Sequence, residues 1–368
     1  MKRREFLTRG AAGAAAAGIL TGCSPESVSS GEAPAVTGKK VFWRLASSFS
    51  PSLDTIFGAA EVLSRRVEAL THGNFKIQVG AAGEFLPGLQ VLDGVESGSV
   101  QVGHTASYYY KGKNLSLVYD TALPFGLTAR QQLAWLYEGG GREIINKVYA
   151  DFNIVSFPGG NTGTQMGGWF RRDIESLDDL NGLKMRIPGL GGEVMSLLGV
   201  TVQVIAAPEI YPALERGAID ATEWVGPYDD EKLGFHKVAD HYVYPGWWEP
   251  GPSLSFIVNQ SAWDALPADY KAAFEAASHE AGLTMLTKYD AKNPAALKRL
   301  IEGGIHIKPF PKDVLEASYE AFNELVAEYR SKDKQFAGIY DQWDSYRKAS
   351  AKWFGYAESA YLNFSTTV

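Results

Sequence analysis

The feature that most constrains the fold of this chain is a run of helix, glycine and short strand at residues 216–227 (RGAIDATEWVGP). Gly217 ends an amphipathic helix, because glycine readily adopts the left-handed conformation found just after a helix C-terminus. Residues 218–221 then alternate in the manner of a short strand, so Glu223 and Trp224 follow its carboxyl end. Open α/β sheets bind ligands at this edge, which makes Glu223 a candidate site residue.

A second copy of the same order lies at residues 95–104 (VESGSVQVGH). Gly98 corresponds to Gly217, and His104 corresponds to Glu223, six residues after the glycine in each copy. We interpret the repeat as two similar lobes that face each other across a cleft. The alternative is that this order is simply common in α/β proteins.

The first part of the chain has the pattern of a parallel sheet with crossover helices. Alternating residues predict strands at 40–46, 75–79 and 100–104, and apolar residues at helical spacing predict helices at 53–70 and 89–95. The order strand, helix, strand, helix, strand is typical of such a sheet.

Two extended segments further along are predicted to connect the lobes. Residues 153–157 and 165–170 are joined by a glycine-rich patch at 159–163, which can act as a hinge. Residues 254–258 are predicted to be a second crossing strand.

The rest of the chain is predicted to continue the α/β order and to end in long helices. We expect strands at 183–187 and 202–205, and helices at 130–149 (interrupted by glycines), 191–198, 208–215, 227–242, 263–287 and over most of 314–363. The prediction is a two-lobed α/β fold with hinge strands and long C-terminal helices. Its parts are lobe I (40–162 with about 225–253), lobe II (about 163–224 with 254–312) and a C-terminal helical segment (313–368).

The C-terminal segment carries a stripe of mostly aromatic residues. The stripe consists of Phe336, Tyr340, Trp343, Ser350, Phe354, Ala357 and Tyr361. Part of it must pack on the lobes, and any excess would form a homodimer surface.

The N-terminus has the pattern of an export signal, at residues 1–22, followed by a low-complexity tether at 23–39. Arg3 and Arg4 resemble the twin-arginine motif, and the residues ending at Cys23 (LTGC) resemble a bacterial lipobox. This predicts a periplasmic protein, exported by the twin-arginine route and lipid-anchored through Cys23. A small-residue cleavage site after the alanine-rich run is the alternative to lipidation.

Charge and cysteine content exclude some classes of function. Residues 1–22 contain four basic side chains and one acidic one, so removing them changes the formal net charge from -7 to -10. An acidic surface argues against nucleic acid and anionic lipid as partners. Cys23 is the only cysteine, which excludes an internal disulfide and favours acylation over a catalytic thiol.

Five residues form a candidate ligand site. Arg186 ends a strand before a glycine-rich helix start, where its guanidinium can hold a carboxylate by two parallel bonds. Glu223 and Trp224 follow the strand described above. Gln165 lies on the hinge strand, and Glu249 follows two tryptophans in an apolar setting. Tyr108, Tyr109 and Tyr110 either line the same pocket or form a buried loop.

Two glutamates beside one arginine require a further positive charge, because burying an unpaired carboxylate is costly. Oxygen atoms from Gln165, Glu223 and the Trp224 carbonyl suit a hard cation such as Na⁺ or Ca²⁺. Glu249 would then be protonated and donate to an oxo or hydroxyl oxygen. The alternatives are a salt bridge for Arg186, a helix-start position for Glu223, and ordinary strand or surface positions for Gln165 and Glu249.

Catalytic motifs are absent from the sequence. It contains no HExxH, GxSxG, P-loop or CxxC pattern, and its six histidines lack zinc-ligand spacing. The remaining enzymatic hypothesis is a secreted metal-assisted lyase with Glu223 as base and Glu249 as acid. A structural or signalling receptor is a third hypothesis.

Four runs together resemble one family. They are GNTGTQMGGWF, LKMRIPGLGGEV, ALERGAIDATEWVGPYDD and YPGWWEPG, in this order. They resemble the solute-binding subunits of TRAP (tripartite ATP-independent periplasmic) transporters, in particular the branch that binds 2-oxo acids and hydroxy acids. The resemblance covers the chain after about residue 40 and implies a periplasmic-binding-protein-like fold.

The resemblance also implies roles for single residues. The arginine of the RIPG motif, Arg186, binds the substrate carboxylate. Gln165, Glu223 and Trp224 hold a metal ion and the ligand, and Glu249 completes the pocket. The implied cargo is a small monocarboxylate such as pyruvate or lactate, delivered to TRAP membrane subunits without catalysis.

Members of this branch are described as homodimers with exchanged C-terminal helices, which agrees with the aromatic stripe. The lipobox at Cys23 departs from the many relatives that are free in the periplasm.

Overall fold

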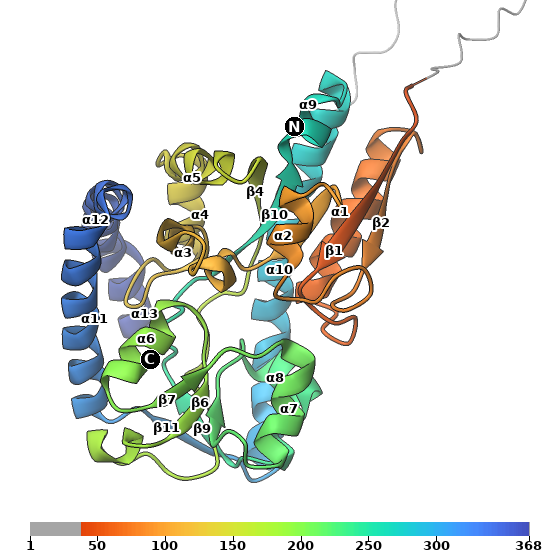
Figure 1. Cartoon of the computed structure of the whole chain (residues 1–368). Helices are drawn as coiled ribbons and strands as arrows, with labels where there is room; N and C mark the ends of the chain where they lie inside the picture. The colour runs from red at the N-terminus through yellow and green to blue at the C-terminus, as the bar shows by residue number, and fades with distance from the viewer. Residues whose placement is uncertain (1–37, 368) are drawn as a thin grey trace, which may run out of the picture. The chain divides into compact units, whose positions relative to one another are not determined.

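The computed structural model describes residues 38–367, which form one compact unit from Lys39 onward (Figure 1). The predicted export signal, Cys23 and all but the last two residues of the predicted tether lie outside the described residues.

Two mixed β-sheets organise the described chain. The first sheet has the strand order β2-β1-β3-β10-β4, and the second has the order β11-β9-β5-β8-β6-β7. We call each sheet with the helices packed on it a lobe. The strands are β1 (Val41–Ser47), β2 (Phe75–Gly80), β3 (Val102–Thr105), β4 (Ile154–Asn161), β5 (Gly168–Phe170), β6 (Lys184–Arg186), β7 (Thr201–Gln203), β8 (Ala221–Thr222), β9 (His241–Tyr244), β10 (Ser253–Asn259) and β11 (His306–Pro309).

The helices cover both sheets and then form the C-terminal segment. They are α1 (Ile56–Leu70), α2 (Val91–Glu96), α3 (Val118–Thr121), α4 (Ala129–Tyr137), α5 (Gly141–Ala150), α6 (Gly189–Leu197), α7 (Ala207–Glu215), α8 (Pro227–Leu233), α9 (Gln260–Asp264), α10 (Ala268–Glu302), α11 (Lys312–Lys332), α12 (Lys334–Phe354) and α13 (Ala360–Ser365).

The first sheet begins as predicted. Strand β1 is parallel to both β2 and β3, and the alternating residues Leu45 and Ile77 are buried among the helices. Strand β10 is antiparallel and lies between β3 and β4. The two glycines of the repeat, Gly98 and Gly217, both have positive φ angles, 75° and 69°, which confirms that each provides a left-handed turn.

The second sheet is built from shorter strands. Strand β8 has two residues, and β5, β6 and β7 have three each. Strands β6 and β8 are parallel, with Arg186 opposite Thr222. The side chains that end these two strands therefore emerge at one edge of the sheet.

The predicted lobe boundaries are wrong at two strands. Strand β9, placed in lobe I, pairs with β5 and β11 of the second sheet, and β10, placed in lobe II, pairs with β3 and β4 of the first. Strand β9 was not predicted, because its first residues were assigned to the predicted helix over residues 227–242. Helix α8 in fact ends at Leu233, where Gly234 has a φ of 77°. The chain crosses between the sheets after β4, after β9, and again through α10 between β10 and β11. Residues 254–258, predicted as a second crossing strand, instead lie within β10 of the first sheet.

Helix α10 links the two lobes. It packs on α1 and β4 of the first lobe and on α8 of the second. The predicted helix over residues 263–287 is longer in the structure: α10 has 35 residues and continues through Pro294.

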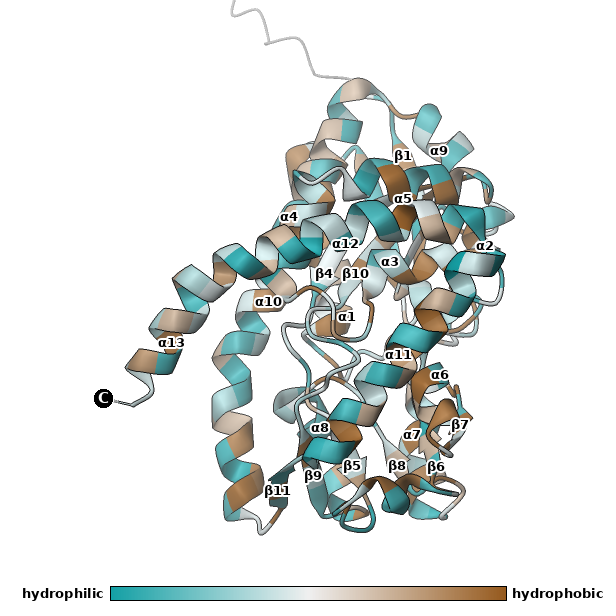
Figure 2. Ribbon diagram, turned by 90° about the vertical axis from the view of Figure 1, so that its left-hand side faces the viewer, coloured by the Kyte–Doolittle hydropathy of each residue, from teal (hydrophilic) through white to brown (hydrophobic). Residues whose placement is uncertain are grey.

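The aromatic stripe of the C-terminal segment divides into two halves. Phe336 and Trp343 are buried, whereas Tyr361 is 68% exposed. After a π-helical turn at Gly355–Ser359, α13 extends away from the other elements (Figure 2). Exposed apolar side chains concentrate in this last part, namely Trp353, Tyr356, Tyr361, Leu362 and Phe364.

Among residues 38–367, no helix combines the length and the apolar character that crossing a membrane requires.

Candidate ligand-binding site

A cavity lies between the two lobes and is lined by most of the predicted site residues. Side chains of Arg186, Glu223, Trp224 and Gln165 line it. Its walls come from the two sheets, and its floor comes from the two segments that cross between them.

The wall from the second lobe carries a buried ion pair. Arg186 ends β6 and Glu223 follows β8, and the parallel pairing of these strands brings the two side chains together. Both residues are about 1% exposed. Arg186 Nη1 bonds to Glu223 Oε1, and Arg186 Nε donates to the Ile205 carbonyl at 3.3 Å. The Arg186 guanidinium also lies 5.3 Å from the centre of the Trp224 ring.

Burial dominates the electrostatics of this pair. It raises the pKa of Glu223 to about 7, although the Arg186 charge acts in the opposite direction, and nearby Asp230 raises it further. Burial by itself lowers the pKa of Arg186, but the Glu223 carboxylate outweighs it, so the pKa is raised. The guanidinium is therefore a fixed positive charge, whereas burial disfavours the charged form of Glu223.

The floor is formed where the two crossing segments bond to each other. The backbone N–H of Gln165 donates to the backbone carbonyl of Glu249 at 3.2 Å, and the backbone N–H of Gly246 donates to the backbone carbonyl of Gln165 at 3.0 Å. A Cβ atom at Gly246 would lie 2.7 Å from the Gln165 carbonyl oxygen, so this close approach requires glycine. The Gln165 side chain donates from Nε2 to Thr162 Oγ1 at 3.1 Å.

Two oxygen atoms at the floor are buried without a hydrogen-bond partner among the described residues, Gln165 Oε1 and Glu249 Oε2. Burial raises the pKa of Glu249 well above its ordinary value, and the neighbouring Glu223 raises it further. Burial therefore favours the neutral form of Glu249, although this residue is not among those that line the cavity. Buried atoms without partners are rare, and these two are available to a ligand or an ion.

The wall from the first lobe is apolar and aromatic. Phe49, Tyr108 and Tyr109 line the cavity, and burial raises the pKa of Tyr109 to about 12. Tyr110 instead packs beneath them, with its hydroxyl 2.9 Å from Thr105 Oγ1. Tyr108 and Tyr109 therefore line the pocket, whereas Tyr110 is part of a buried loop.

His104 has no role like that of Glu223. It is fully buried within the first lobe, with Nδ1 3.4 Å from Ser47 Oγ, and burial lowers its pKa to about 3. The repeated backbone pattern therefore does not extend to a repeated site.

Sequence reasoning missed Thr162, Phe49 and Pro252 as lining residues. Thr162 lies in the TGTQ run three residues before Gln165, and that position was the one signal that could have indicated it. Phe49 and Pro252 carry no chemical pattern that separates them from core residues.

The donor atoms fit the predicted cation. No group of three acidic, histidine or cysteine side chains that could hold a metal occurs within residues 38–367. The predicted set instead combines the Gln165 amide oxygen, the Glu223 carboxylate and the Trp224 carbonyl. These are hard oxygen donors, which suit Na⁺ or Ca²⁺ rather than a transition metal.

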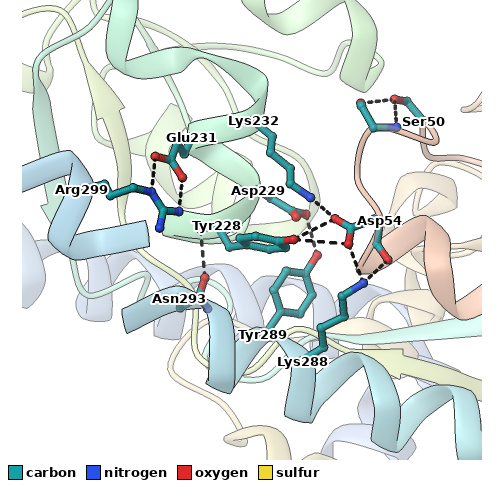
Figure 3. Close-up of polar contacts among 11 residues, drawn as sticks. Ser50, Asp54, Tyr228, Asp229, Glu231, Lys232, Lys288, Tyr289, Asn293 and Arg299 are labelled. Carbon is teal, nitrogen blue, oxygen red and sulfur yellow. Dashed lines mark hydrogen bonds and ion pairs between the residues drawn. The ribbon is translucent and has the colours of Figure 1, made fainter. Parts of the chain in front are cut away.

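Ion pairs also connect the two lobes. Asp54, just before α1 in the first lobe, accepts from Tyr228 Oη at 3.2 Å and from Lys288 Nζ at 2.6 Å, and it pairs with Lys232 of α8 (Figure 3). Elsewhere, Lys111 of the first lobe pairs with Glu193 of α6.

The model of the family described as bacterial extracellular solute-binding protein, family 7, matches residues 46–333. The chain belongs to this family. It is 52% identical over 367 residues to a monocarboxylate 2-oxoacid-binding periplasmic protein of Nostoc sp., with 100% of both chains covered.

Solved structures of TRAP solute-binding proteins are also similar. A Bordetella bronchiseptica protein, a mixed-occupancy dimer with copurified calcium and picolinate, is 49% identical, with a TM-score of 0.89 over 90% of this chain and 98% of that one. A Pseudoalteromonas atlantica protein with bound sodium and pyruvate is 44% identical, with a TM-score of 0.85 over 88% of this chain and 99% of that one.

These similarities confirm the predicted α/β fold of the periplasmic-binding-protein kind. They also show that the chain is a periplasmic solute receptor and not an enzyme, so we do not retain the lyase hypothesis.

Proposed function

We propose that this receptor binds a small monocarboxylate, a 2-oxo acid such as pyruvate or a hydroxy acid such as lactate, together with Na⁺ or Ca²⁺, and delivers it to TRAP membrane subunits. The observation that carries the proposal is the buried Arg186–Glu223 pair, beside the unpartnered Gln165 Oε1. Similar proteins contain pyruvate with sodium and picolinate with calcium, which supports the choice of ligand and ion.

Charge balance explains why an anion and a cation would bind together. The ligand carboxylate takes the place of Glu223 beside Arg186, where a bidentate pair contributes about 1.5–3 kcal/mol. Glu223 then needs a new positive partner, and a cation supplies it while also bonding to ligand oxygen. Gln165 Oε1 and the Trp224 carbonyl complete the proposed ligands from the protein.

The neutral Glu249 carboxyl group would donate to the remaining oxo or hydroxyl oxygen of the ligand.

We also propose that the exposed end of the C-terminal segment forms a homodimer. Trp353, Tyr356, Tyr361 and Phe364 are 62–75% exposed in a single chain, and an apolar surface of this kind is usually covered by a partner. The structure from Bordetella bronchiseptica is described as a dimer. Light scattering should show two chains, and truncation after residue 351 should give one.

Export by the twin-arginine route and a lipid anchor at Cys23 remain proposals from the sequence. A Cys23→Ser variant that stays in the membrane fraction would contradict the anchor, and export after Arg3→Lys and Arg4→Lys together would contradict the route.

A thermal-shift panel tests the proposed ligand. Three- to six-carbon oxo and hydroxy acids are added with Na⁺, with Ca²⁺ or with neither ion, and a ligand at 100 times its Kd should add about 2.7 kcal/mol of stability. A shift that needs both acid and ion supports the proposal. Equal shifts without any added cation, after exhaustive dialysis against a chelator and sodium-free buffer, would refute the shared ion.

A further inference from the structure

Asp230, in α8, is a buried carboxylate whose two oxygens face different groups. Oδ1 accepts from the backbone amides of Val225 at 3.3 Å and Gly226 at 3.2 Å. Oδ2 accepts from Trp169 Nε1 at 3.0 Å and Tyr242 Oη at 2.6 Å. The residue is 1% exposed, so all four donors compensate for the burial of its charge.

The bonds to Oδ1 fix the peptide that joins Trp224 to Val225. This peptide is trans, because the one cis bond among the described residues is Tyr244–Pro245. In a planar trans peptide the N–H and C=O groups point in opposite directions. Since the Val225 N–H points at Asp230, the Trp224 carbonyl must point away from Asp230.

The Trp224 carbonyl is also free to bind something else. No hydrogen bond to it occurs within the described part of the chain, whereas the neighbouring Glu223 carbonyl accepts from Thr222 Oγ1 at 2.9 Å. Trp224 and Val225 line the cavity, and Asp230 lies behind them, outside its lining.

We propose that Asp230 is the positioning residue for the cation site: it holds the Val225 and Gly226 amides so that the Trp224 carbonyl faces the cavity before any ligand arrives. This rests on the proposed function, since it assigns that carbonyl to the cation. Asp230 itself does not touch the ion. Its connections to Trp169 of β5 and Tyr242 of β9 fix it to the second sheet, so the carbonyl is held by rigid strands rather than by a free loop.

The main variant is Asp230→Asn. A carboxylate accepts at both oxygens, whereas an amide carries an NH₂ at one end, which would face either the two backbone amides or the Trp169 N–H, all of which are donors. Calcium is titrated calorimetrically in the presence of saturating pyruvate. We expect the variant to bind Ca²⁺ roughly 10- to 100-fold more weakly, the range typical of residues that orient metal ligands.

Two control variants separate positioning from stability. Tyr242→Phe removes one donor from Oδ2 and leaves the bonds from Val225, Gly226 and Trp169, so stability should fall and Ca²⁺ affinity should fall by less than it does in Asp230→Asn. Asp120→Asn alters a buried carboxylate of the first lobe, which accepts from Ser255 Oγ at 2.6 Å and Tyr149 Oη at 2.9 Å. It should also lower stability without affecting Ca²⁺ binding.

A second measurement uses the wild-type protein alone and decides the matter even if Asp230→Asn does not fold. In cation-free protein, hydrogen exchange of the Val225 and Gly226 amides should be slow, because Asp230 already binds them. Exchange as fast as in an exposed loop would overturn the inference. So would a folded Asp230→Asn protein with wild-type Ca²⁺ affinity. Failure of the wild type to bind either Ca²⁺ or Na⁺ together with pyruvate would instead overturn the proposed function.

Discussion

The two walls of the cavity differ in kind, although each follows the same order of helix, glycine and strand. The wall from the first lobe presents Phe49, Tyr108 and Tyr109 and no charged side chain to the cavity, whereas the wall from the second lobe presents Arg186 and Glu223. Charge is therefore supplied by one lobe and shape by the other. This division implies that affinity for the carboxylate and selectivity among carboxylates can be changed separately.

The largest effect is expected from Arg186→Ala, which removes the fixed positive charge of the second-lobe wall. Loss of a buried charged partner costs about 2–5 kcal/mol, or about 30- to 5,000-fold in affinity. Calorimetric titration with pyruvate and Ca²⁺ should show this loss, and Arg216→Ala, at an exposed arginine of the same lobe, should not. Tight binding by Arg186→Ala would mean that the anion is held elsewhere.

Glu223→Gln tests the other half of the charged wall. The amide keeps the size of the side chain and removes its negative charge. The affinities for pyruvate and for Ca²⁺ should therefore fall together, by roughly 10- to 100-fold. Glu231→Gln, at the neighbouring α8 residue that bonds to Arg299 Nε at 2.8 Å, is the matched control. If pyruvate affinity responds neither to this substitution nor to removal of Ca²⁺, the cation has no place at the site.

Tyr109→Phe tests the aromatic wall. The loss of one hydroxyl should reduce affinity by only about 2- to 10-fold, which corresponds to about 0.5–1.5 kcal/mol. The more informative result is the ratio of affinities for pyruvate and 2-oxopentanoate, which should change more than it does in Glu223→Gln. An equal loss for both acids would mean that this wall also contributes general affinity.

The last prediction concerns stability rather than affinity, in the ligand-free protein with its buried acids on the second-lobe side. Burial raises the pKa of Asp229 to about 7 from an ordinary value of 3.8. The folded state therefore binds this proton more tightly than the unfolded state, so stability should rise as pH falls from about 7 to about 4, by at most about 1.4 kcal/mol per pH unit. In Asp229→Asn, melting temperatures between pH 5 and 7.5 should depend less on pH. Exposed Asp151→Asn is the control, and an unchanged slope in Asp229→Asn would contradict the assignment.

The sequence allowed prediction of the charged wall because its residues stand at strand ends. Arg186 and Glu223 each follow a short alternating run, and parallel pairing of neighbouring strands brings such ends together. The same argument could not separate Tyr108 and Tyr109 from Tyr110, since their positions depend on how a single turn packs on the opposite lobe.

The exchange of β9 and β10 between lobes shows where pattern reasoning fails. Strand β9 has only four residues, and its membership of the second sheet depends on pairing with Gly168 and Trp169 far along the chain. Asp229 and Asp230 also look like ordinary acids in the first turn of a helix. Their burial becomes apparent only from Tyr289 and Tyr242, which approach from other elements.

Helix α10 has a mechanical consequence for how the cavity admits a ligand. Pro294 lacks the N–H that would bond to the Asp290 carbonyl, so the helix is easiest to bend at this point. Next to it, Asn293 Oδ1 accepts from the Tyr228 amide of α8 at 3.1 Å, so the soft point lies where α10 meets the second lobe. A small bend of α10 at this point would move the charged wall away from the aromatic one and open the cavity without breaking any strand pairing.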